Sequence, residues 1–178
     1  MKRGFTLIEL IITIVMLAAL VGVTAFVFRA VLLSWSSQET RSGIDISLDR
    51  GIEEIVRDLR EARQVNDNYD GDGTKNDEIR FTQDQSNYYI YYFYNANDAY
   101  PPTFNQSSYD LRKATLSGGI GGTLTDSGRI IITDVLSPSH ATSPSDLSFS
   151  SNIATIDLSI TRRDETIRSR SQVKPRNL

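Results

Sequence analysis

The chain of 178 residues contains no cysteine, one histidine and one tryptophan. Without cysteine there is no disulfide, no thiol nucleophile and no cysteine-ligated metal, so packing must stabilise the fold. The one histidine, His140, lies in a segment rich in serine and proline, and no G-x-S-x-G sequence surrounds any serine. A Ser-His-Asp site is therefore not expected. Neither a Walker A sequence nor a G-x-G-x-x-G pattern occurs, so these absences disfavour an enzyme.

An apolar stretch near the N-terminus is the longest segment without charge. The nineteen residues from Leu10 to Phe28 carry no formal charge. As a helix they reach close to the ~30 Å of a bilayer's hydrocarbon. Lys2 and Arg3 precede the stretch, which predicts a cytoplasmic N-terminus and an extracytoplasmic remainder. Trp35, after the stretch, suits the depth of the lipid headgroups.

One acidic residue does not fit a plain membrane anchor. Glu9 falls about one turn inside the apolar helix. There a carboxylate costs about 2.5 kcal/mol or more unless it is neutralised or paired. We expect Glu9 to need a partner, and the sequence offers none nearby.

The segment from Lys2 to about Leu33 resembles the type IV prepilin signal. It has a short basic leader ending in Gly4, then Phe-Thr-Leu-Ile-Glu at residues 5–9, then the apolar run. The resemblance implies cleavage after Gly4 by a prepilin peptidase acting in trans, N-methylation of the new terminus at Phe5, and a need for Glu9 in assembly. If subunits stack helically, the Glu9 carboxylate can pair with the Phe5 amine of a neighbour, which removes two charges from the membrane.

Two other interpretations of this segment remain open. A secretory signal peptide would have a small-residue cleavage site after the apolar region, and no clear A-x-A pattern precedes Trp35. The apolar region also exceeds the ~7–15 residues typical of such peptides. An uncleaved signal anchor would account for Lys2, Arg3 and the apolar run, but it would leave Glu9 unexplained.

The charge balance bears on possible partners. The chain has 19 basic and 22 acidic side chains, for a net charge of −3. Loss of a leader with Lys2 and Arg3 leaves 17 basic against 22 acidic side chains, or −5. Phosphate binding needs clustered Lys and Arg, so no direct nucleic-acid partner is expected. The partners that the resemblance implies are the prepilin peptidase and N-methyltransferase, other pilin or pseudopilin subunits, and the inner membrane.

A second helical pattern follows the apolar run. Apolar residues recur at helical spacing in the set Leu48, Ile52, Ile55, Val56, Leu59 and Ala62. Most charged residues of this segment, Asp58 included, are assigned to the other faces, so the pattern predicts an amphipathic helix with one face to bury. If this helix continues the membrane segment, it runs from Phe5 to Arg63, with Gly22 and Gly43 as its weakest points.

From residue 66 onward the pattern changes to that of β-strands. We expect strands at 79–82, 87–94, 109–116 and 129–136, and a hairpin of 155–161 and 167–173 with its turn at 162–165. The glycines of residues 118–122 predict a turn, and residues 137–146 predict a surface loop. The strand at 87–94 is so aromatic that both of its faces need cover. Arg168 and Arg170 are assigned to the exposed face of the hairpin.

These elements predict an α+β fold in which a long N-terminal helix packs on a C-terminal antiparallel sheet, as in pilins. The expected organisation is a leader at 1–4, a transmembrane and assembly helix at 5–33, an amphipathic helix at 34–65 that extends into the head, and an antiparallel β head at 66–178. With the membrane segment set aside, the remaining length suits one ordinary domain.

An acidic, glycine-rich loop is the candidate metal site. Oxygen-bearing side chains stand at calcium-loop spacing at Asn68, Asp70, Asp72 and Asn76, and Glu78 lies one residue before the expected closing acid. Position 12 is Ile79, and no second helix follows, so a standard EF-hand is not expected. A solvated turn in which Asp and Gly supply conformation is the competing interpretation.

The function that the resemblance implies is that of a non-enzymatic minor pilin or pseudopilin, which caps or initiates a type II secretion pseudopilus or type IV pilus. The segments 58–62 (DLREA) and 173–177 (VKPRN) look like those of the J-type minor pseudopilin and the W-type minor pilin. Two rivals are a membrane-anchored periplasmic enzyme and a pilus-tip adhesin. The adhesin would use the tyrosines of 88–94 or the acidic loop, although aromatic strands more often serve packing.

Overall fold

The computed structural model describes residues 6–66, 77–98, 100–140, 142, 144–162 and 165–177. The chain divides into two compact units, the first ending at Thr40 and the second beginning at Arg41.

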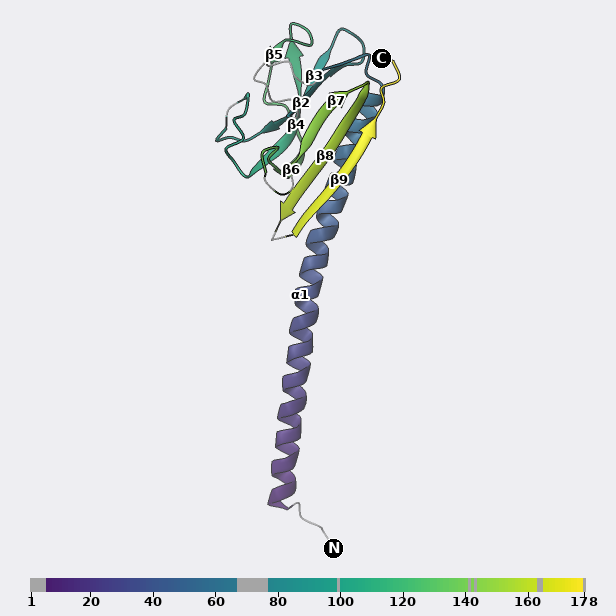
Figure 1. Cartoon of the computed structure of the whole chain (residues 1–178). Coiled ribbons are helices and arrows are strands. Elements are labelled where there is room, and N and C mark those ends of the chain that lie inside the picture. Colours follow the sequence, from purple (N-terminus) through teal and green to yellow (C-terminus); the bar gives the residue numbers. More distant parts are fainter. Residues whose placement is uncertain are drawn as a thin grey trace. The chain divides into compact units, whose positions relative to one another are not determined.

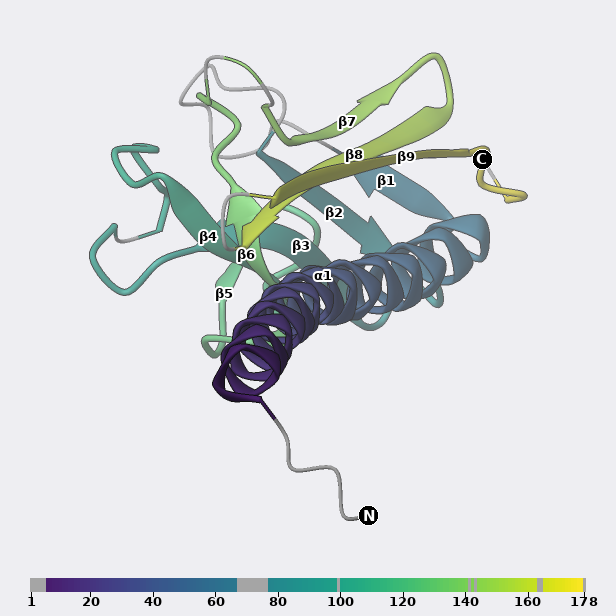
Figure 2. The same cartoon turned by 90° about the horizontal axis from the view of Figure 1, so that it is seen from below.

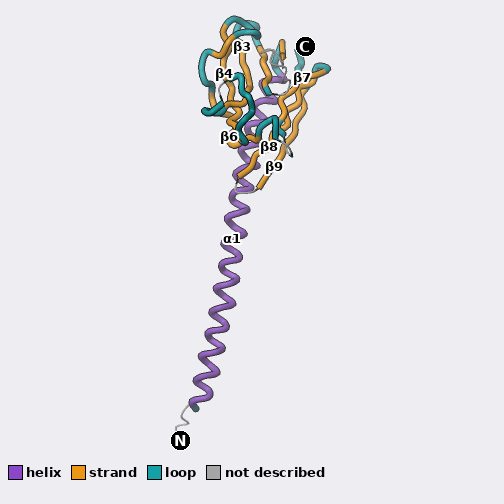
Figure 3. Tube along the Cα trace, turned by 60° about the vertical axis from the view of Figure 1, so that its left-hand side comes forward, coloured by secondary structure: helices purple, strands orange, loops and turns teal. Residues whose placement is uncertain are grey.

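The helix α1 (Leu7–Arg60) runs for 54 residues and continues through Gly22 and Gly43 (Figure 3). Between Leu10 and Phe28 it carries no charged residue on any side, and its large hydrophobic side chains are exposed. By length and composition it is long and apolar enough to cross a membrane. A helix that is hydrophobic all round needs lipid or protein around it, so a membrane anchor fits this part of α1.

The second unit holds an antiparallel sheet. Nine strands lie within the described residues: β1 (Gln64–Asn66), β2 (Glu78–Thr82), β3 (Tyr88–Tyr94), β4 (Ser108–Ser117), β5 (Thr123–Leu124), β6 (Arg129–Leu136), β7 (Asp146–Ser150), β8 (Ile153–Arg162) and β9 (Glu165–Val173). Their order is β1-β2-β3-β4-β6-β8-β7, with β5 added to β4 and β9 to β8 (Figure 1, Figure 2). The predicted α+β fold is confirmed.

The strands predicted from the sequence match β2, β3, β4, β6 and the β8–β9 hairpin. Three strands were not predicted, namely β1, β5 and β7, which have three, two and five residues. Strands this short carry too little periodicity to be recognised in the sequence. They form because they can pair with a neighbouring strand of the sheet. The predicted surface loop of residues 137–146 accordingly ends where β7 begins, at Asp146.

The core lies between the last turns of α1 and the concave side of the sheet, and the strands arch over this part of the helix (Figure 2). The predicted apolar stripe is buried, with Val56 partly buried, and Ile44 joins it one turn earlier. The sheet contributes large residues from several strands, among them Phe81, Tyr91 and Leu111. Burial of one such side chain stabilises the fold by about 1.5–3 kcal/mol, so this contact holds the second unit together.

Strand β3 is covered on both faces, as its aromatic sequence predicts. Tyr91 and Phe93 belong to the core against α1. Ile90 and Tyr92 belong to a second cluster on the opposite face, with Ala114 and Leu116 from β4 and with Tyr88, Tyr94, Tyr100 and Leu124 packed around them. Most of the aromatic area of this strand therefore serves packing.

The helix approaches the sheet closely at Gly51. A Cβ atom at this position would overlap Cγ1 and Cδ1 of Ile132 on β6. Gly51 is buried, whereas Gly43, on the same helix, has nothing within 4 Å of where its Cβ would lie. Gly43 and Gly51 thus differ in structural role, because the missing side chain of Gly51 permits the helix to contact β6.

The Gly51→Ala substitution is expected to lower the free energy of unfolding by about 1–3 kcal/mol, because the new methyl overpacks Ile132. The matched control Gly43→Ala is expected to raise it by up to about 1 kcal/mol through helix propensity. In an Ile132→Ala background, Gly51→Ala should become stabilising. Thermal unfolding of the detergent-solubilised chain measures all four, and an unchanged sign in the Ile132→Ala background would contradict the proposed overlap.

The loop between β3 and β4 is organised around one buried carboxylate. Asp98 accepts hydrogen bonds from Thr103 N at 3.0 Å, Thr103 Oγ1 at 2.8 Å, Phe104 N at 2.9 Å and Tyr109 Oη at 2.6 Å. Burial raises the pKa of Asp98, but the hydrogen bonds outweigh it, so its pKa lies below the ordinary value. Tyr109 in turn has its pKa raised by burial and by Asp98 to about 12, so it remains a donor.

Because the pKa of Asp98 is lower in the folded chain, its contribution to stability is present above the unfolded pKa of about 3.9. That contribution is lost as the pH falls through the lower, folded-state pKa. The Asp98→Asn variant is therefore expected to be less stable than the original chain by about 2 kcal/mol at neutral pH. The difference in melting temperature should shrink as the pH is lowered below the unfolded pKa, and a difference independent of pH would refute this assignment.

Candidate processing and assembly site

The first turn of α1 holds the Glu9 side chain. The backbone N–H and the hydroxyl of Thr6 both donate to Glu9 Oε2 at 2.9 Å, and Glu9 N–H donates to Thr6 Oγ1 at 3.4 Å. Thr6, Leu7, Ile8 and Glu9 thus form a capping box of the T-x-x-E type at the helix start. The positive end of the helix dipole adds to this stabilisation of the carboxylate.

This geometry corrects the expectation that Glu9 has no partner nearby in the sequence. Thr6, three residues earlier, supplies two donors to it. The T-x-x-E spacing was the signal that could have revealed this contact. Both bonds end on Oε2, and Oε1 accepts no hydrogen bond from the described residues. One carboxylate oxygen therefore retains capacity for a donor from another molecule.

The two residues predicted to flank the cleavage point, Gly4 and Phe5, lie outside the described residues. The roles assigned to Gly4, Phe5 and Glu9 remain predictions.

Most of the acidic loop proposed for calcium also lies outside the described residues: this applies to Asn68, Asp70, Asp72 and Asn76. The fifth residue, Glu78, is on β2 and is buried. Its carboxylate accepts from Arg80 Nε at 2.6 Å and from the hydroxyl of Tyr100. Within the described ranges no three His, Asp or Glu side chains gather at a metal-binding distance. The calcium interpretation remains a prediction.

The buried ion pair of Glu78 and Arg80 has a structural task. Besides Glu78, Arg80 donates to the carbonyls of Ile120 at 3.3 Å and Gly122 at 2.9 Å, and to Tyr100 Oη at 2.8 Å. The turn of residues 118–122, where Gly118 and Gly119 adopt positive φ angles, is thereby tied to β2. Several hydrogen bonds to a buried charge offset the cost of removing it from water.

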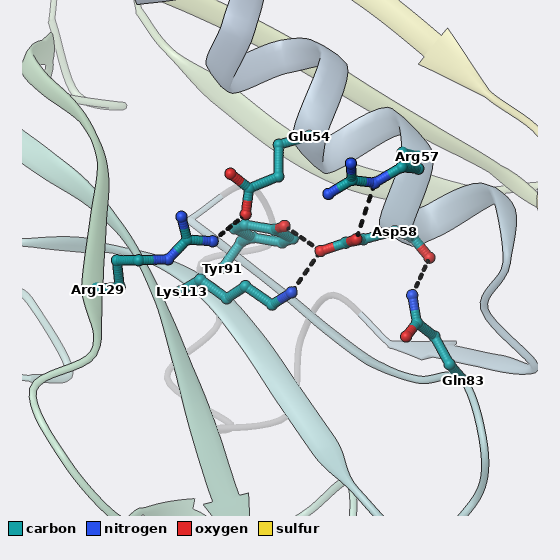
Figure 4. A network of polar contacts seen from close by, with 7 residues as sticks. All are labelled: Glu54, Arg57, Asp58, Gln83, Tyr91, Lys113 and Arg129. Carbon is teal, nitrogen blue, oxygen red and sulfur yellow. Dashed lines mark hydrogen bonds and ion pairs between the residues drawn. The ribbon is translucent and has the colours of Figure 1, made fainter.

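A second polar network joins the end of α1 to the sheet (Figure 4). Asp58, on the last turns of α1, is only 6% exposed. Its Oδ2 accepts from Tyr91 Oη at 2.7 Å and from Lys113 Nζ at 2.5 Å. Burial, together with Asp58, raises the pKa of Tyr91, so the phenol stays protonated and donates. Lys113 Nζ also lies 4.9 Å from the centroid of the Tyr89 ring, a cation–π contact.

The burial of Asp58 corrects its assignment to the exposed faces of the helix. Asp58 lies three residues after Ile55 and four before Ala62, and this spacing places it on the buried stripe. An acid on an apolar stripe was the available signal. Its partners Tyr91 and Lys113 are 33 and 55 residues away, so no local pattern could identify them.

The segments 58–62 and 173–177, which the sequence analysis selected as motifs, meet in the structure. Arg176 N–H donates to the carbonyl of Arg60 at 3.0 Å, and the Asn177 amide donates to the carbonyl of Glu61 at 3.3 Å. Pro175 is buried beside them. Carbonyls at the end of a helix lack partners within it, so the C-terminal tail caps α1.

The tyrosines considered for ligand stacking are largely engaged within the fold. Tyr91 and Tyr92 are buried, while Tyr88, Tyr89 and Tyr94 are partly exposed. Arg112 covers the Tyr94 ring at 3.8 Å from its centroid. An open groove of about 590 Å³ lies beside Tyr89, between Lys113–Thr115 and Asp126–Arg129. Lys113 and Arg129, its cationic residues, are already paired with Asp58 and Glu54.

Comparison with known proteins concerns the N-terminus. The family model described as the prokaryotic N-terminal methylation motif matches residues 1–25. No curated protein and no solved structure matches the chain. The fold defines a pilin-like architecture, in which a long apolar N-terminal helix precedes a C-terminal antiparallel sheet. Within that class, residues 1–25 are a type IV pilin-like prepilin signal.

This match supports a type IV pilin-like protein that is processed at its N-terminus and anchored in a membrane. Proteins with this signal are generally structural rather than catalytic, and the signal implies processing by a prepilin peptidase and assembly of the pilin type.

Asp58→Asn is expected to destabilise the chain by about 2–4 kcal/mol, because Lys113 then loses the carboxylate that neutralises it. Lys113→Met should lower stability by a comparable amount, and the double variant should lose less stability than the two single changes added together.

Arg57 supplies the matched control, since it lies 3.8 Å from the same carboxylate but its side chain is 69% exposed. Arg57→Ala should change stability by about 0.5 kcal/mol at most. Strict additivity in denaturant unfolding would show that Asp58 and Lys113 are not coupled.

Proposed function

We propose that this protein is a minor pilin or pseudopilin, processed after Gly4 and assembled through Glu9 into a type II secretion pseudopilus or a type IV pilus. The observation that carries the proposal is the prepilin signal at the start of one uninterrupted apolar helix. Such a helix is suited both to storage in a bilayer and to packing against other helices in a fibre.

The geometry of Glu9 suggests how assembly becomes favourable. In the single subunit, Thr6 donates two hydrogen bonds to Oε2, which lowers the cost of a carboxylate in lipid without neutralising it. Cleavage after Gly4 would leave both Thr6 donors in place and create a new ammonium at Phe5. When subunits stack, that ammonium can approach Glu9 Oε1 of a neighbour, and two membrane charges are then neutralised together.

The orientation follows from the leader. Lys2 and Arg3 would keep the N-terminus in the cytoplasm, so the head from Arg41 onward would be periplasmic, anchored by a single pass through the inner membrane. The organisation that we propose is a leader at 1–4, a transmembrane and assembly helix at 5–33, an amphipathic helix from residue 34 to Arg60, and a β head. The predicted boundary between helix and head at residues 65 and 66 moves, because α1 ends at Arg60 and β1 begins at Gln64.

Within the pilin class we favour the J-type minor pseudopilin and the related W-type minor pilin. The support is that the two segments resembling these proteins, 58–62 and 173–177, contact each other through the cap on α1. A subunit of this kind would cap or initiate the fibre together with other minor subunits.

Processing tests the class of protein. In cells with a prepilin peptidase, the mature chain is expected to begin with N-methylated Phe5, identified by mass spectrometry of the N-terminal peptide. In a peptidase-deficient strain, or with Gly4→Val, the leader should remain. A mature chain that begins at Met1 in peptidase-positive cells would overturn the proposal.

Glu9→Gln separates the two roles of the acidic residue. Glutamine also fits a capping box, so the helix start should be preserved, but its amide cannot neutralise an ammonium. We expect Glu9→Gln to be processed normally and to enter sheared fibres at least about tenfold less than the original chain, as a loss of about 1.4 kcal/mol already produces. Incorporation at the original level would exclude charge pairing as the driving contact.

A further inference from the structure

Strand β9 forms a long edge of the sheet. It pairs with β8 over nine consecutive residue pairs, from Arg162 with Glu165 to Ala154 with Val173, without a register shift. It contains neither glycine nor proline, and within the described residues it pairs with no other strand. The edge strands β1 and β5 have only three and two residues. The strand β7, at the end of the order, has five residues, and its Leu147 forms a bridge with Asp77. A long, regular edge is a template for another strand, and proteins usually interrupt or cover it.

The register identifies which backbone groups point outward from this edge. Two residues separate Arg162 from Glu165, and in such a hairpin the flanking pair is hydrogen-bonded. Bonded and non-bonded pairs then alternate, so Thr166, Arg168, Arg170 and Gln172 are in non-bonded pairs. Their N–H and C=O groups point away from β8, and the described residues provide no backbone partner for them.

Charged side chains often protect an edge, but the arginines of β9 point toward the neighbouring strand β8 and not toward the free edge. Arg168 donates to both oxygens of Asp157 on β8, from Nε at 2.6 Å and from Nη2 at 2.8 Å. Arg170 Nε lies 3.8 Å from the same carboxylate. Asp157 is only 3% exposed. The guanidinium groups are thus held over β8, and the backbone of the edge stays accessible to an added strand.

The charge of this region indicates what kind of strand would fit. Residues 162–178 contain six basic and two acidic side chains, whereas the rest of the chain contains 13 basic and 20 acidic ones. Arg168 and Arg170 face two carboxylates, Asp157 and its cross-strand neighbour Asp146 on β7. Their side chains are nevertheless 50% and 61% exposed, so both arginines remain within reach of acidic groups on an added strand. A second β9 strand in this place would oppose arginine to arginine, which disfavours a symmetric pair.

We propose that β9 binds, by strand addition, an extended segment of a partner protein with acidic side chains at every second position. The backbone of the segment pairs with the outward groups of Thr166, Arg168, Arg170 and Gln172. Its acidic side chains lie beside the two arginines, and its intervening side chains extend the half-buried face formed by Ile167, Ser169 and Ser171. This interaction requires neither processing nor fibre assembly, so it goes beyond the proposed function.

The test uses the purified full chain in detergent micelles and labelled nine-residue peptides, with binding followed by fluorescence anisotropy. A peptide alternating Glu and Val is the probe. We expect it to bind at least about tenfold tighter than a peptide alternating Lys and Val, because its glutamates are attracted to the arginines of β9 and lysines are repelled. A Glu–Val peptide N-methylated on its glutamate amides should lose a similar factor, because in an antiparallel addition the glutamates lie opposite Thr166, Arg168, Arg170 and Gln172 and their N–H groups donate to the edge.

Proline variants of the chain locate the binding to the edge. In non-bonded pairs proline removes no β8–β9 hydrogen bond, so Thr166→Pro and Gln172→Pro should keep the melting temperature while weakening the Glu–Val peptide about tenfold. The matched variants Thr166→Ala and Gln172→Ala keep the N–H groups and should bind as the original chain does. The Glu9→Gln variant should also bind the Glu–Val peptide as the original chain does. The peptide test therefore does not depend on the role of Glu9 in fibre assembly, and the two proposals can fail independently.

Three results would overturn the proposal: equal binding of the Glu–Val and Lys–Val peptides, equal binding of the N-methylated peptide, or no effect of either proline in a chain that remains folded. Binding to vesicles of anionic phospholipid that the prolines leave unchanged, with no binding of the Glu–Val peptide, would instead assign the arginines to a membrane surface.

Discussion

The packing of one apolar helix face against the concave side of the sheet is the interaction on which the head depends. The chain has no disulfide, so no covalent link compensates if that contact weakens. Most strands of the sheet bury side chains in the core against α1, and the helix approaches β6 closely at Gly51. Since α1 also contains the segment that is long and apolar enough to cross a membrane, the same helix includes both this segment and one side of the folded core.

Polar groups make this packing specific. Apolar side chains can slide along one another at little cost, but a buried carboxylate needs its partners at defined positions. Asp58 with Tyr91 and Lys113 fixes how the last turns of α1 meet β3 and β4. The C-terminal tail supplies donors to the last carbonyls of the helix, at Arg60 and Glu61. The end of the helix is therefore held from both the sheet and the chain terminus.

The two ends of α1 handle an acidic residue in different ways. Asp58 is neutralised by a lysine of the same chain, inside a folded core. Glu9 receives two donors from Thr6 but no cation from the described residues. A carboxylate that is partly satisfied can remain in a single subunit and still gain free energy when an ammonium arrives. This difference suits a protein that is stored in a membrane and later assembled.

Local signals in the sequence were sufficient for much of this protein. The prepilin signal, the apolar run, the stripe from Leu48 to Ala62 and the longer strands were all predictable, because each depends on residues within one or two turns or along one strand. The capping box of Thr6 and Glu9 was also readable, although it was missed. Only the tertiary structure decided which partners neutralise Asp58, that the helix approaches β6 at Gly51 whereas Gly43 has nothing nearby, that the tail caps α1, and that β9 is an open edge. The reason is distance along the chain, because these contacts join residues that are far apart in the sequence. Burial and strand register are defined only after the strands have paired in the folded chain.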